Sequence, residues 1–360
     1  MADNNYKKFV SPYPQSKTIK GIRWLGERIR YPGSLGDTWS CTWADDGEIY
    51  STADDGTGIN DSNNSNLALF KIEGKPPEHK ISLVNPMSQY GTGGEYDRAD
   101  SWKANGLICI DGVLYMGVSQ HSSAIDYPDG VQRTYDGSII KSTDHGKTWS
   151  CKRINPMFPG PRFSTPFFVQ YGKNYEGAID EFVYIVSGTS WNNGNALTML
   201  RVARNFISNL NASNYEVFTG LDQKGEPKWA PYDPAKRLEM GSIFKCRNYT
   251  SMTGIHYFPA LKRFLLPEWA YADLDGPDPW FRTVFHLYEA PKPWGPWSLA
   301  HVDEDFGNGA WYNPSLPSKW FEEDGRKLWM VCGGDWGVRR LPASKESEYA
   351  FFARQFELIV

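Results

Sequence analysis

The chain has 360 residues, of which 40% are hydrophobic and 22% charged, with a formal net charge of -4 and a pI near 5.9. This composition is ordinary for a folded globular protein, and the scattered Lys and Arg residues lack the basic stripe of a nucleic-acid-binding protein. No apolar run approaches the ~18 residues that cross a bilayer, and the first ten residues lack the apolar core of a signal peptide. We therefore expect a soluble protein without nucleic-acid or membrane partners, either cytoplasmic or secreted with its leader removed.

Aromatic residues make up 15% of the chain, with 15 Trp, 20 Tyr and 19 Phe. Such rings stack on sugar faces and line interfaces, so their abundance favours a carbohydrate ligand. The five cysteines lie far apart and form no CxxC pair. This spacing excludes a zinc knuckle and a redox motif, and it predicts buried thiols.

Short alternating runs of β-branched and aromatic residues, separated by Gly, Pro, Asn and Asp, are typical of a sandwich or a propeller. Asp-Gly turns recur within residues 45–50, 110–115 and 323–331, each before a strand of alternating apolar residues. Grouping strands around these turns predicts a single all-β domain over residues 1–360, a five-bladed β-propeller. The expected blades are residues 38–98, 99–157, 158–235, 236–302 and 303–360. The last strand, 349–360, is expected to close the ring against residues 19–29.

The first hairpin, residues 36–58, reads GDTWSCTWADDGEIYSTADDGTG. It places Asp37 at the beginning of one strand and Asp54 and Asp55 at the end of the returning strand, so their carboxylates are expected to meet. We assign Asp37 and Asp55 as the acid and the base or nucleophile of a glycosidic-bond cleavage, and Asp54 and Trp39 as substrate contacts. Alternatively, the aspartates cap turns or hold a cation such as calcium, although no EF-hand spacing is present.

Residues 142–150, STDHGKTWS, fit the SxDxGxxW pattern of the Asp-box found in sialidases and other propellers. In this pattern Asp144 and Gly146 form a tight turn and Trp149 packs back against the blade. The Asp-box is structural, so it indicates the fold class and not the chemistry.

His121 follows the strand VLYMGV, at a blade end where loop residues often carry function. We assign it as an assisting catalytic residue, and the alternative is a solvated loop residue. Other residues beside strand ends are assigned to substrate binding, although each could instead be structural: Arg162, Trp191, Asn192, Glu268, Trp269 and Asn313.

Several segments in order along nearly the whole chain resemble the DUF4185-like propellers of bacteria and fungi. They are residues 36–58, 110–115, the Asp-box, 163–186, 191–205, 257–266, 293–297 and 316–331. Some members of the wider grouping are five-bladed glycoside hydrolases that act on D-arabinan with paired aspartates. The resemblance therefore implies glycoside hydrolysis, with Asp37 and Asp55 in the carboxylate positions. The second position departs from the pattern, because this chain has DDG where those enzymes typically have GDT.

The expected function is hydrolysis of a glycosidic bond in a plant or microbial polysaccharide or oligosaccharide, by a monomer that requires no cofactor or metal. A rival hypothesis is a polysaccharide lyase, in which His121 or a tyrosine removes a proton and Arg162 or Lys319 neutralises a uronate. Another is a propeller that binds sugar without turnover. The absence of GxSxG, P-loop, GxGxxG and HExxH motifs excludes serine esterases, NTPases, dehydrogenases and zinc proteases.

Overall fold

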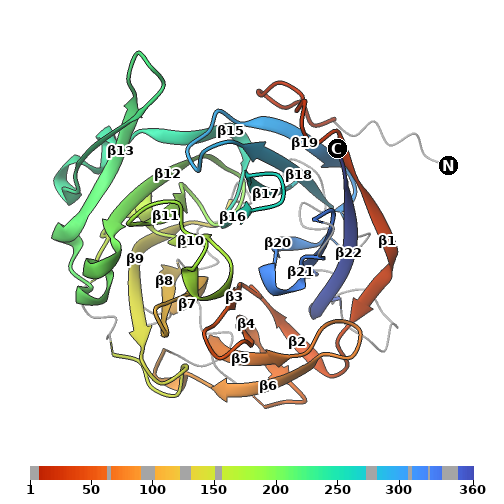
Figure 1. The fold of residues 1–360 in the computed structure, drawn as a ribbon. Coiled ribbons are helices and arrows are strands. Elements are labelled where there is room, and N and C mark those ends of the chain that lie inside the picture. Colours follow the sequence, from red (N-terminus) through yellow and green to blue (C-terminus); the bar gives the residue numbers. More distant parts are fainter. Residues whose placement is uncertain are drawn as a thin grey trace.

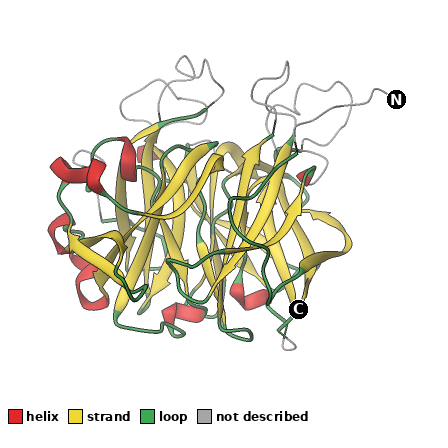
Figure 2. Ribbon diagram, turned by 90° about the horizontal axis from the view of Figure 1, so that it is seen from above, coloured by secondary structure: helices red, strands yellow, loops and turns green. Residues whose placement is uncertain are grey.

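The computed structural model describes residues 8–62, 66–90, 102–121, 131–150, 156–272, 282–306, 310–322, 325–334 and 348–360. These parts of the chain consist of β-strands arranged around a central axis, which Figure 1 views end-on. Figure 2 shows the same strands from the side, where short 3-10 helices lie outside the strand bundle. The chain is therefore a β-propeller, and the prediction of an all-β propeller is confirmed.

The first group of strands is a sheet in the order β2-β4-β5-β6, with β3 also paired to β4. Its turn at residues 45–47 ends in Gly47 with φ 86°, a left-handed conformation that glycine adopts without strain. The strands are β2 (Ser34–Asp37), β3 (Cys41–Trp43), β4 (Ile49–Ile59), β5 (Leu67–Glu73) and β6 (Lys80–Asn85).

The second group is a three-stranded sheet in the order β7-β8-β9, to which Phe158 adds a single bridge at Gly137. Asp111 (φ 52°) and Gly112 (φ 76°) form the β7–β8 turn, and two successive positive φ values are typical of a type I′ hairpin. The strands are β7 (Trp102–Ile110), β8 (Val113–His121) and β9 (Thr134–Ser142).

The third and fourth groups share one sheet, because their inner strands β10 and β16 pair in parallel through Val169 and Ile255. All other pairs in this sheet are antiparallel. The third group comprises β10 (Phe167–Gln170), β11 (Phe182–Gly188), β12 (Gly194–Ala203), β13 (Tyr215–Leu221), β14 (Pro227–Pro231) and β15 (Ser242–Thr250). The fourth comprises β16 (Ile255–Phe258), β17 (Arg263–Tyr271), β18 (Thr283–Ala290) and β19 (Ser298–Asp303).

The fifth group joins the two ends of the described chain. Strands β20 (Tyr312–Ser315), β21 (Lys327–Gly333) and β22 (Phe351–Ile359) are followed in the sheet by β1 (Gly21–Arg30). The pairing of β1 with β22 runs from Gly21–Ile359 to Arg30–Phe352, so the predicted closure of the ring is confirmed. The predicted boundary between residues 235 and 236 differs from the structure, because β15 pairs with β12 and so belongs to the third group.

The short helices of the described residues are all 3-10 helices that connect strands. They are η1 (Ser88–Tyr90), η3 (Pro161–Phe163), η4 (Lys173–Tyr175), η5 (Arg204–Asn209), η6 (Ala212–Asn214), η7 (Pro234–Glu239) and η9 (Ser318–Trp320). No helix in this described part is long and apolar enough to cross a membrane.

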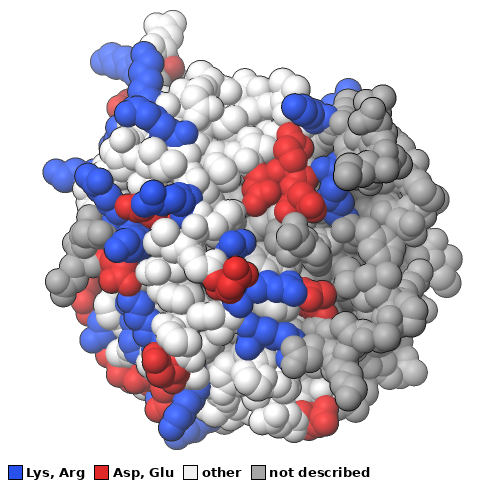
Figure 3. Space-filling view, turned by 90° about the vertical axis from the view of Figure 1, so that its right-hand side faces the viewer, with Lys and Arg blue, Asp and Glu red and all other residues white. Residues whose placement is uncertain are grey.

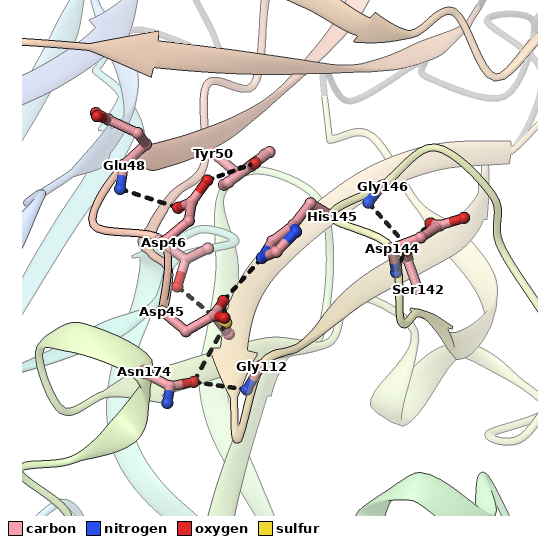
Figure 4. A network of polar contacts seen from close by, with 12 residues as sticks. Asp45, Asp46, Glu48, Tyr50, Gly112, Ser142, Asp144, His145, Gly146 and Asn174 are labelled. Atoms are coloured by element: carbon pink, nitrogen blue, oxygen red, sulfur yellow. Dashed lines mark hydrogen bonds and ion pairs between the residues drawn. The ribbon is translucent and has the colours of Figure 1, made fainter.

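A polar network ties three of the groups together at one end of the inner strands (Figure 4). Asp45 contacts His145 of the second group through an Oδ1–Nε2 distance of 2.9 Å. Cys109 donates its thiol toward Asp45, and Asn174 accepts from the Gly112 N–H at 2.8 Å. Burial acts to raise the pKa of Asp45, but the hydrogen bond and charge of His145 outweigh burial and lower it. Four cysteines, Cys41, Cys109, Cys246 and Cys332, are buried and unbridged as predicted, whereas Cys151 lies outside the described residues.

Candidate active site

The inner strands of the five groups meet at the axis. One narrow space between them is lined by residues of all five groups, including Cys41, Gly106, Phe167, Gly254 and Ser315. Gly106 allows this approach, because a Cβ there would lie 2.6 Å from the Phe167 Cα. Between the described residues that line it, the space has room for about one water molecule.

Three or four positions before these axial residues, the inner strands or the segments leading into them carry buried polar side chains. The residues are Asp37, Lys103, Ser164, Ser251 and Tyr312, and each is at most 8% exposed. At a rise of ~3.3 Å per residue, they lie about 10–13 Å along the chain from the narrow space. The polar end of the inner strands is therefore the candidate active site, and the network of Figure 4 lies at their opposite end.

Asp37 and Asp54 are cross-strand partners in the β2–β4 pair. The backbones approach closely here because Gly36 and Gly56 lack side chains: a Cβ on Gly36 would lie 2.8 Å from the Asp54 carbonyl oxygen. Directly opposed residues have Cβ atoms about 4.5–5.5 Å apart and side chains on one face of the sheet. The two carboxyl groups are thus neighbours.

Hydrogen-bond donors surround the Asp37 carboxylate. It accepts a short hydrogen bond from the Tyr312 hydroxyl and another from Thr38 Oγ1 at 2.9 Å. Burial raises the pKa of Asp37, while Tyr312, the charge of Lys103, Thr38 and Tyr349 each act to lower it. These four groups favour the ionised form of Asp37.

Asp54 has fewer partners than Asp37. Its Oδ1 accepts from the Ala104 N–H at 3.1 Å, and its Oδ2 is buried without a hydrogen-bond partner among the described residues. Burial raises the pKa of Asp54 well above its usual value; Lys103 opposes this, and the charge of Asp37 reinforces it. The surroundings of Asp54 thus favour the protonated form more strongly than those of Asp37 do.

Lys103 supplies the positive charge of the site. Its side chain is 1% exposed, and its ammonium group makes a short ion pair with Asp55. Burial lowers the pKa of Lys103 to about 8, and the charges of Asp54 and Asp37 act to raise it. One lysine thus lies within the field of three aspartates.

Aromatic rings border the carboxylates on the side of the fourth and fifth groups. Trp269, Tyr271, Tyr312 and Tyr349 form one buried cluster, with Leu35 packed against it. The Trp269 and Tyr312 ring centroids are 5.2 Å apart, and the Trp269 indole N–H donates to the Met252 carbonyl at 3.2 Å. The cluster holds the Tyr312 ring in place, so that its hydroxyl reaches Asp37.

The structure changes the assignment of the second carboxylate. Asp55 was predicted to act with Asp37, but it pairs with Lys103, and Asp54 is the residue opposite Asp37. The reason lies in the backbone: Asp55 has a positive φ of 52°, which interrupts the alternation of side chains along β4 just after Asp54.

The predicted sugar platform Trp39 is a core residue. Its ring is 0% exposed and packs against Phe70 and Phe351, and its indole N–H donates to the Gly36 carbonyl at 3.1 Å. Trp269 is also buried, within the cluster beside Tyr312. Neither ring therefore offers an open face to a sugar.

The other predicted substrate contacts fall into two classes. Asn313 adjoins Tyr312 and has a buried Nδ2 without a partner among the described residues. Glu268 accepts from the Ser251 N–H at 2.9 Å, and burial raises its pKa well above the usual value. Each of them thus adjoins one of the buried polar residues at the end of the inner strands, Asn313 beside Tyr312 and Glu268 beside Ser251.

The remaining contacts are structural. Asn192 accepts from the Gln132 N–H at 2.6 Å, and Trp191 belongs to the core of the third group. Arg162 donates to the Met240 carbonyl at 2.9 Å, and Lys319 is paired with Glu48 at 2.7 Å. These contacts are with residues other than the carboxylate pair. The side chain of His121 lies outside the described residues.

Sequence reasoning missed Lys103, Tyr312 and Tyr349. A signal for Lys103 was present, since it is the one charged residue of the strand WKANGLICI. A charged side chain in an otherwise buried strand needs a partner of opposite charge. Tyr312 and Tyr349 carried no such signal. Within the described ranges, no group of three or more His, Cys, Asp or Glu side chains is placed to hold a metal ion.

This arrangement can transfer protons. A protonated carboxyl and an ionised carboxylate, side by side and held by different partners, are the pattern that general acid–base chemistry requires. The positive charge of Lys103 compensates one negative charge of the buried pair Asp37–Asp54.

Solved structures with the same fold include two that are similar over almost their whole length. A protein of Bacteroides ovatus named only as a hydrolase matches at 14% identity and a TM-score of 0.56, over 91% of this chain and 87% of its own. An α-L-arabinofuranosidase of Podospora anserina, solved with cellotriose, matches at 10% identity and a TM-score of 0.51, over 96% and 98%. No family model and no curated protein matches the sequence. Identities this low show the fold alone, a fold that this chain shares with the arabinofuranosidase.

Proposed function

We propose that the protein is a glycoside hydrolase whose polar site at the axis cleaves a glycosidic bond of an oligosaccharide or polysaccharide. The observation that carries the proposal is the pair Asp37–Asp54, two buried carboxyl groups opposed across β2 and β4. Paired carboxyls with separated pKa values are the catalytic device of most glycosidases. Membership of the DUF4185-like propellers is part of the proposal.

Each carboxyl takes the role that its surroundings favour. Asp54, whose pKa is raised well above the usual value, donates its proton to the glycosidic oxygen as the bond to the anomeric carbon breaks. Asp37, whose carboxylate accepts hydrogen bonds from Tyr312 and Thr38, takes a proton from the attacking water or attacks the anomeric carbon itself. Tyr312 acts as a positioning residue for Asp37. No cofactor is required by these steps.

The lyase hypothesis predicts different products, which are unsaturated and absorb in the ultraviolet. A lyase needs a cation beside its base to neutralise a uronate carboxylate. Arg162 and Lys319, the residues suggested for this role, are bound to Met240 and Glu48. The other rival is a propeller that binds sugar without cleaving it, and an activity assay distinguishes it from a hydrolase.

Asp37→Asn tests the proposal, because it keeps the shape of the side chain and removes its basicity. We expect a loss of about 10²- to 10⁴-fold in kcat on arabinans, xylans and aryl glycosides, measured as released reducing ends. Asp54→Asn should lose activity on substrates with poor leaving groups and retain more on aryl glycosides, whose leaving groups need less protonation.

Asp45→Asn is the matched control, since Asp45 belongs to the same group of strands but contacts His145 at the opposite end. It should retain wild-type kcat. Equal activity of wild type and Asp37→Asn on a cleaved substrate would overturn the assignment. If the protein binds sugar but releases no reducing ends from any of these substrates, the hypothesis of a non-catalytic propeller is favoured.

A further inference from the structure

A buried lysine joins the second group of strands to the carboxylates of the first. Strand β7, which carries Lys103, lies beside the first hairpin near the axis (Figure 1), and the Ala104 N–H donates to Asp54 Oδ1 at 3.1 Å. The residue opposite Lys103 on β8 is Ser119, which is uncharged. Lys103 therefore finds its partners of opposite charge in the first group.

Asp55 is the direct partner of Lys103. Their short ion pair lies almost out of contact with solvent, because the Lys103 side chain is 1% exposed and the Asp55 side chain is 10% exposed. Water and salt screen a buried ion pair much less than an exposed one. A change of charge at either residue therefore acts on the groups around it.

The charge of Lys103 reaches both members of the carboxyl pair. It acts to lower the pKa of Asp37 and that of Asp54, and their charges in turn act to raise the pKa of Lys103. The other side chains that lower these two carboxyl pKa values are hydroxyl groups, which are neutral at pH 7: Thr38, Tyr312 and Tyr349. Lys103 is thus the cation that acts on the pair within the described structure.

The other described elements packed against β7 near Lys103 bring no further charge. Strand β10, which approaches Gly106, has the uncharged sequence FFVQ. Cys41 of β3 keeps its proton, because burial raises its pKa to about 12. On the opposite face of β7, Ala104 belongs to an apolar cluster with Leu67. The charges around Lys103 are therefore those of the three aspartates.

We propose that Lys103 is a positioning residue of the pair Asp37–Asp54. Its charge, shared with Asp55, fixes the pH range in which one carboxyl of the pair is ionised while the other is protonated. This inference deepens the proposed glycoside hydrolysis, on which its consequence for catalysis rests. Loss of the positive charge should move the range to higher pH, and loss of the opposing charge of Asp55 should move it to lower pH.

The test compares Lys103→Met with Asp55→Asn, which break the same ion pair but change the local charge in opposite directions. Protein labelled with ¹³C at its aspartate carboxyl carbons is titrated by NMR, and the signals of Asp37 and Asp54 are identified by their loss in Asp37→Asn and Asp54→Asn. Both apparent pKa values should rise in Lys103→Met and fall in Asp55→Asn, each by about one pH unit.

Shifts in the same direction in the two variants, or none in either, would overturn the proposal, because an ion pair with only a structural role predicts no opposite shifts. If Lys103→Met does not fold, Asp55→Asn decides alone, and an upward shift or no shift contradicts the proposal. Lys319→Met is the matched control, since Lys319 pairs with Glu48 at 2.7 Å beside the turn at the opposite end of the hairpin. It should leave both titrations unchanged.

The pH profile of kcat/KM on an aryl glycoside measures the consequence for catalysis. Its two limbs should move to higher pH in Lys103→Met and to lower pH in Asp55→Asn, by about the same amounts as the titrations. Limbs that stay in place while the titrations shift would overturn the proposal, since other groups would then control the reaction. If the titrations shift as expected but the wild type cleaves no substrate, the role of Lys103 toward the pair is supported and the proposed hydrolysis is contradicted.

Discussion

Buried acidic residues in this protein owe their properties to their partners. Asp37 and Asp54 are both buried, yet Asp37 is surrounded by donors while Asp54 keeps one oxygen without a partner. Burial raises the pKa of both, and Lys103 and Thr38 act to lower both, so the difference between them comes from Tyr312 and Tyr349, which act on Asp37 alone. Glu268 is a third buried acid, and no positive charge is among the causes of its pKa shift.

Glu268→Gln should stabilise the protein at neutral pH relative to wild type. Burial raises the pKa of Glu268 well above 4.5, so its stabilising contribution is full below pH 4.5 and declines as the pH rises toward the folded-state pKa. Glutamine resembles the protonated acid and does not titrate. The stability difference should therefore grow with pH, with a slope of at most about 1.4 kcal/mol per pH unit. Urea unfolding between pH 4.5 and 8 measures it.

Glu289→Gln is the control for this experiment, because Glu289 is also buried in the same group of strands but pairs with Arg263 at 2.9 Å. Its replacement should lower the stability at neutral pH, since it removes one partner of an ion pair. A Glu268→Gln difference that stays constant with pH would show that Glu268 has an ordinary pKa.

At the scale of elements, the turn after β9 depends on local hydrogen bonds and a close contact. Asp144 accepts from the Thr148 N–H at 2.9 Å and from its hydroxyl at 2.7 Å, and the Gly146 N–H donates to Ser142 Oγ at 2.8 Å. Hydrogen bonds from Thr148 lower the pKa of Asp144 to about 2. Trp149, five residues after Asp144, packs against the neighbouring core.

Gly146→Ala should destabilise the protein more than Gly47→Ala. Both glycines have left-handed φ values, 88° and 86°, so the backbone strain of alanine is similar. A Cβ at Gly146 would overlap the buried Leu69 side chain, whereas a Cβ at Gly47 meets nothing within 4 Å. The difference should be about 1–3 kcal/mol, as for overpacking, measured by urea unfolding. Equal losses would show that Leu69 moves aside without cost.

At the scale of the whole molecule, the ring is closed by strands from the two ends of the chain. Trp24 of β1 contacts Phe356 of β22, and its indole N–H donates to Asp303 Oδ2 at 3.2 Å. Arg354 lies over its ring at 4.9 Å. Ion pairs between Arg23 and Glu357 and between Arg28 and Glu348 cross this face, where Figure 3 shows acidic and basic side chains interspersed. Closure thus combines backbone pairing with side-chain contacts.

Trp24→Ala should lower the stability by about 2–4 kcal/mol, because it removes contacts that join the fourth and fifth groups. Trp43→Ala provides the comparison: Trp43 is also half-buried, but its indole N–H donates only to Gly47 of its own hairpin. Trp43→Ala should lower the stability less than Trp24→Ala does, by a difference of at least about 1 kcal/mol. Thermal unfolding of both variants measures these losses of stability. Equal losses in the two variants would argue against a special role of the closing strand.

Much of the fold could be predicted from sequence because it depends on local signals. Alternating apolar residues and Asp-Gly turns mark hairpins at 45–47 and 111–112, where the structure has them. The assignment of β22 to the N-terminal strand followed from the need to pair an otherwise open edge. The candidate site was predictable in part: Asp37 and Asp54 lie in one hairpin, so chain proximity brings them together.

What the sequence by itself determined is the set of strands, the hairpin that carries the aspartates and the ring closure, because each depends on residues close in the chain or on edge pairing. The tertiary structure decided that Asp54 and not Asp55 faces Asp37, because the backbone at Asp55 takes a positive φ. It also decided that Lys103 and Tyr312 join the site and that Trp39 does not, because inner strands distant in sequence meet only at the axis.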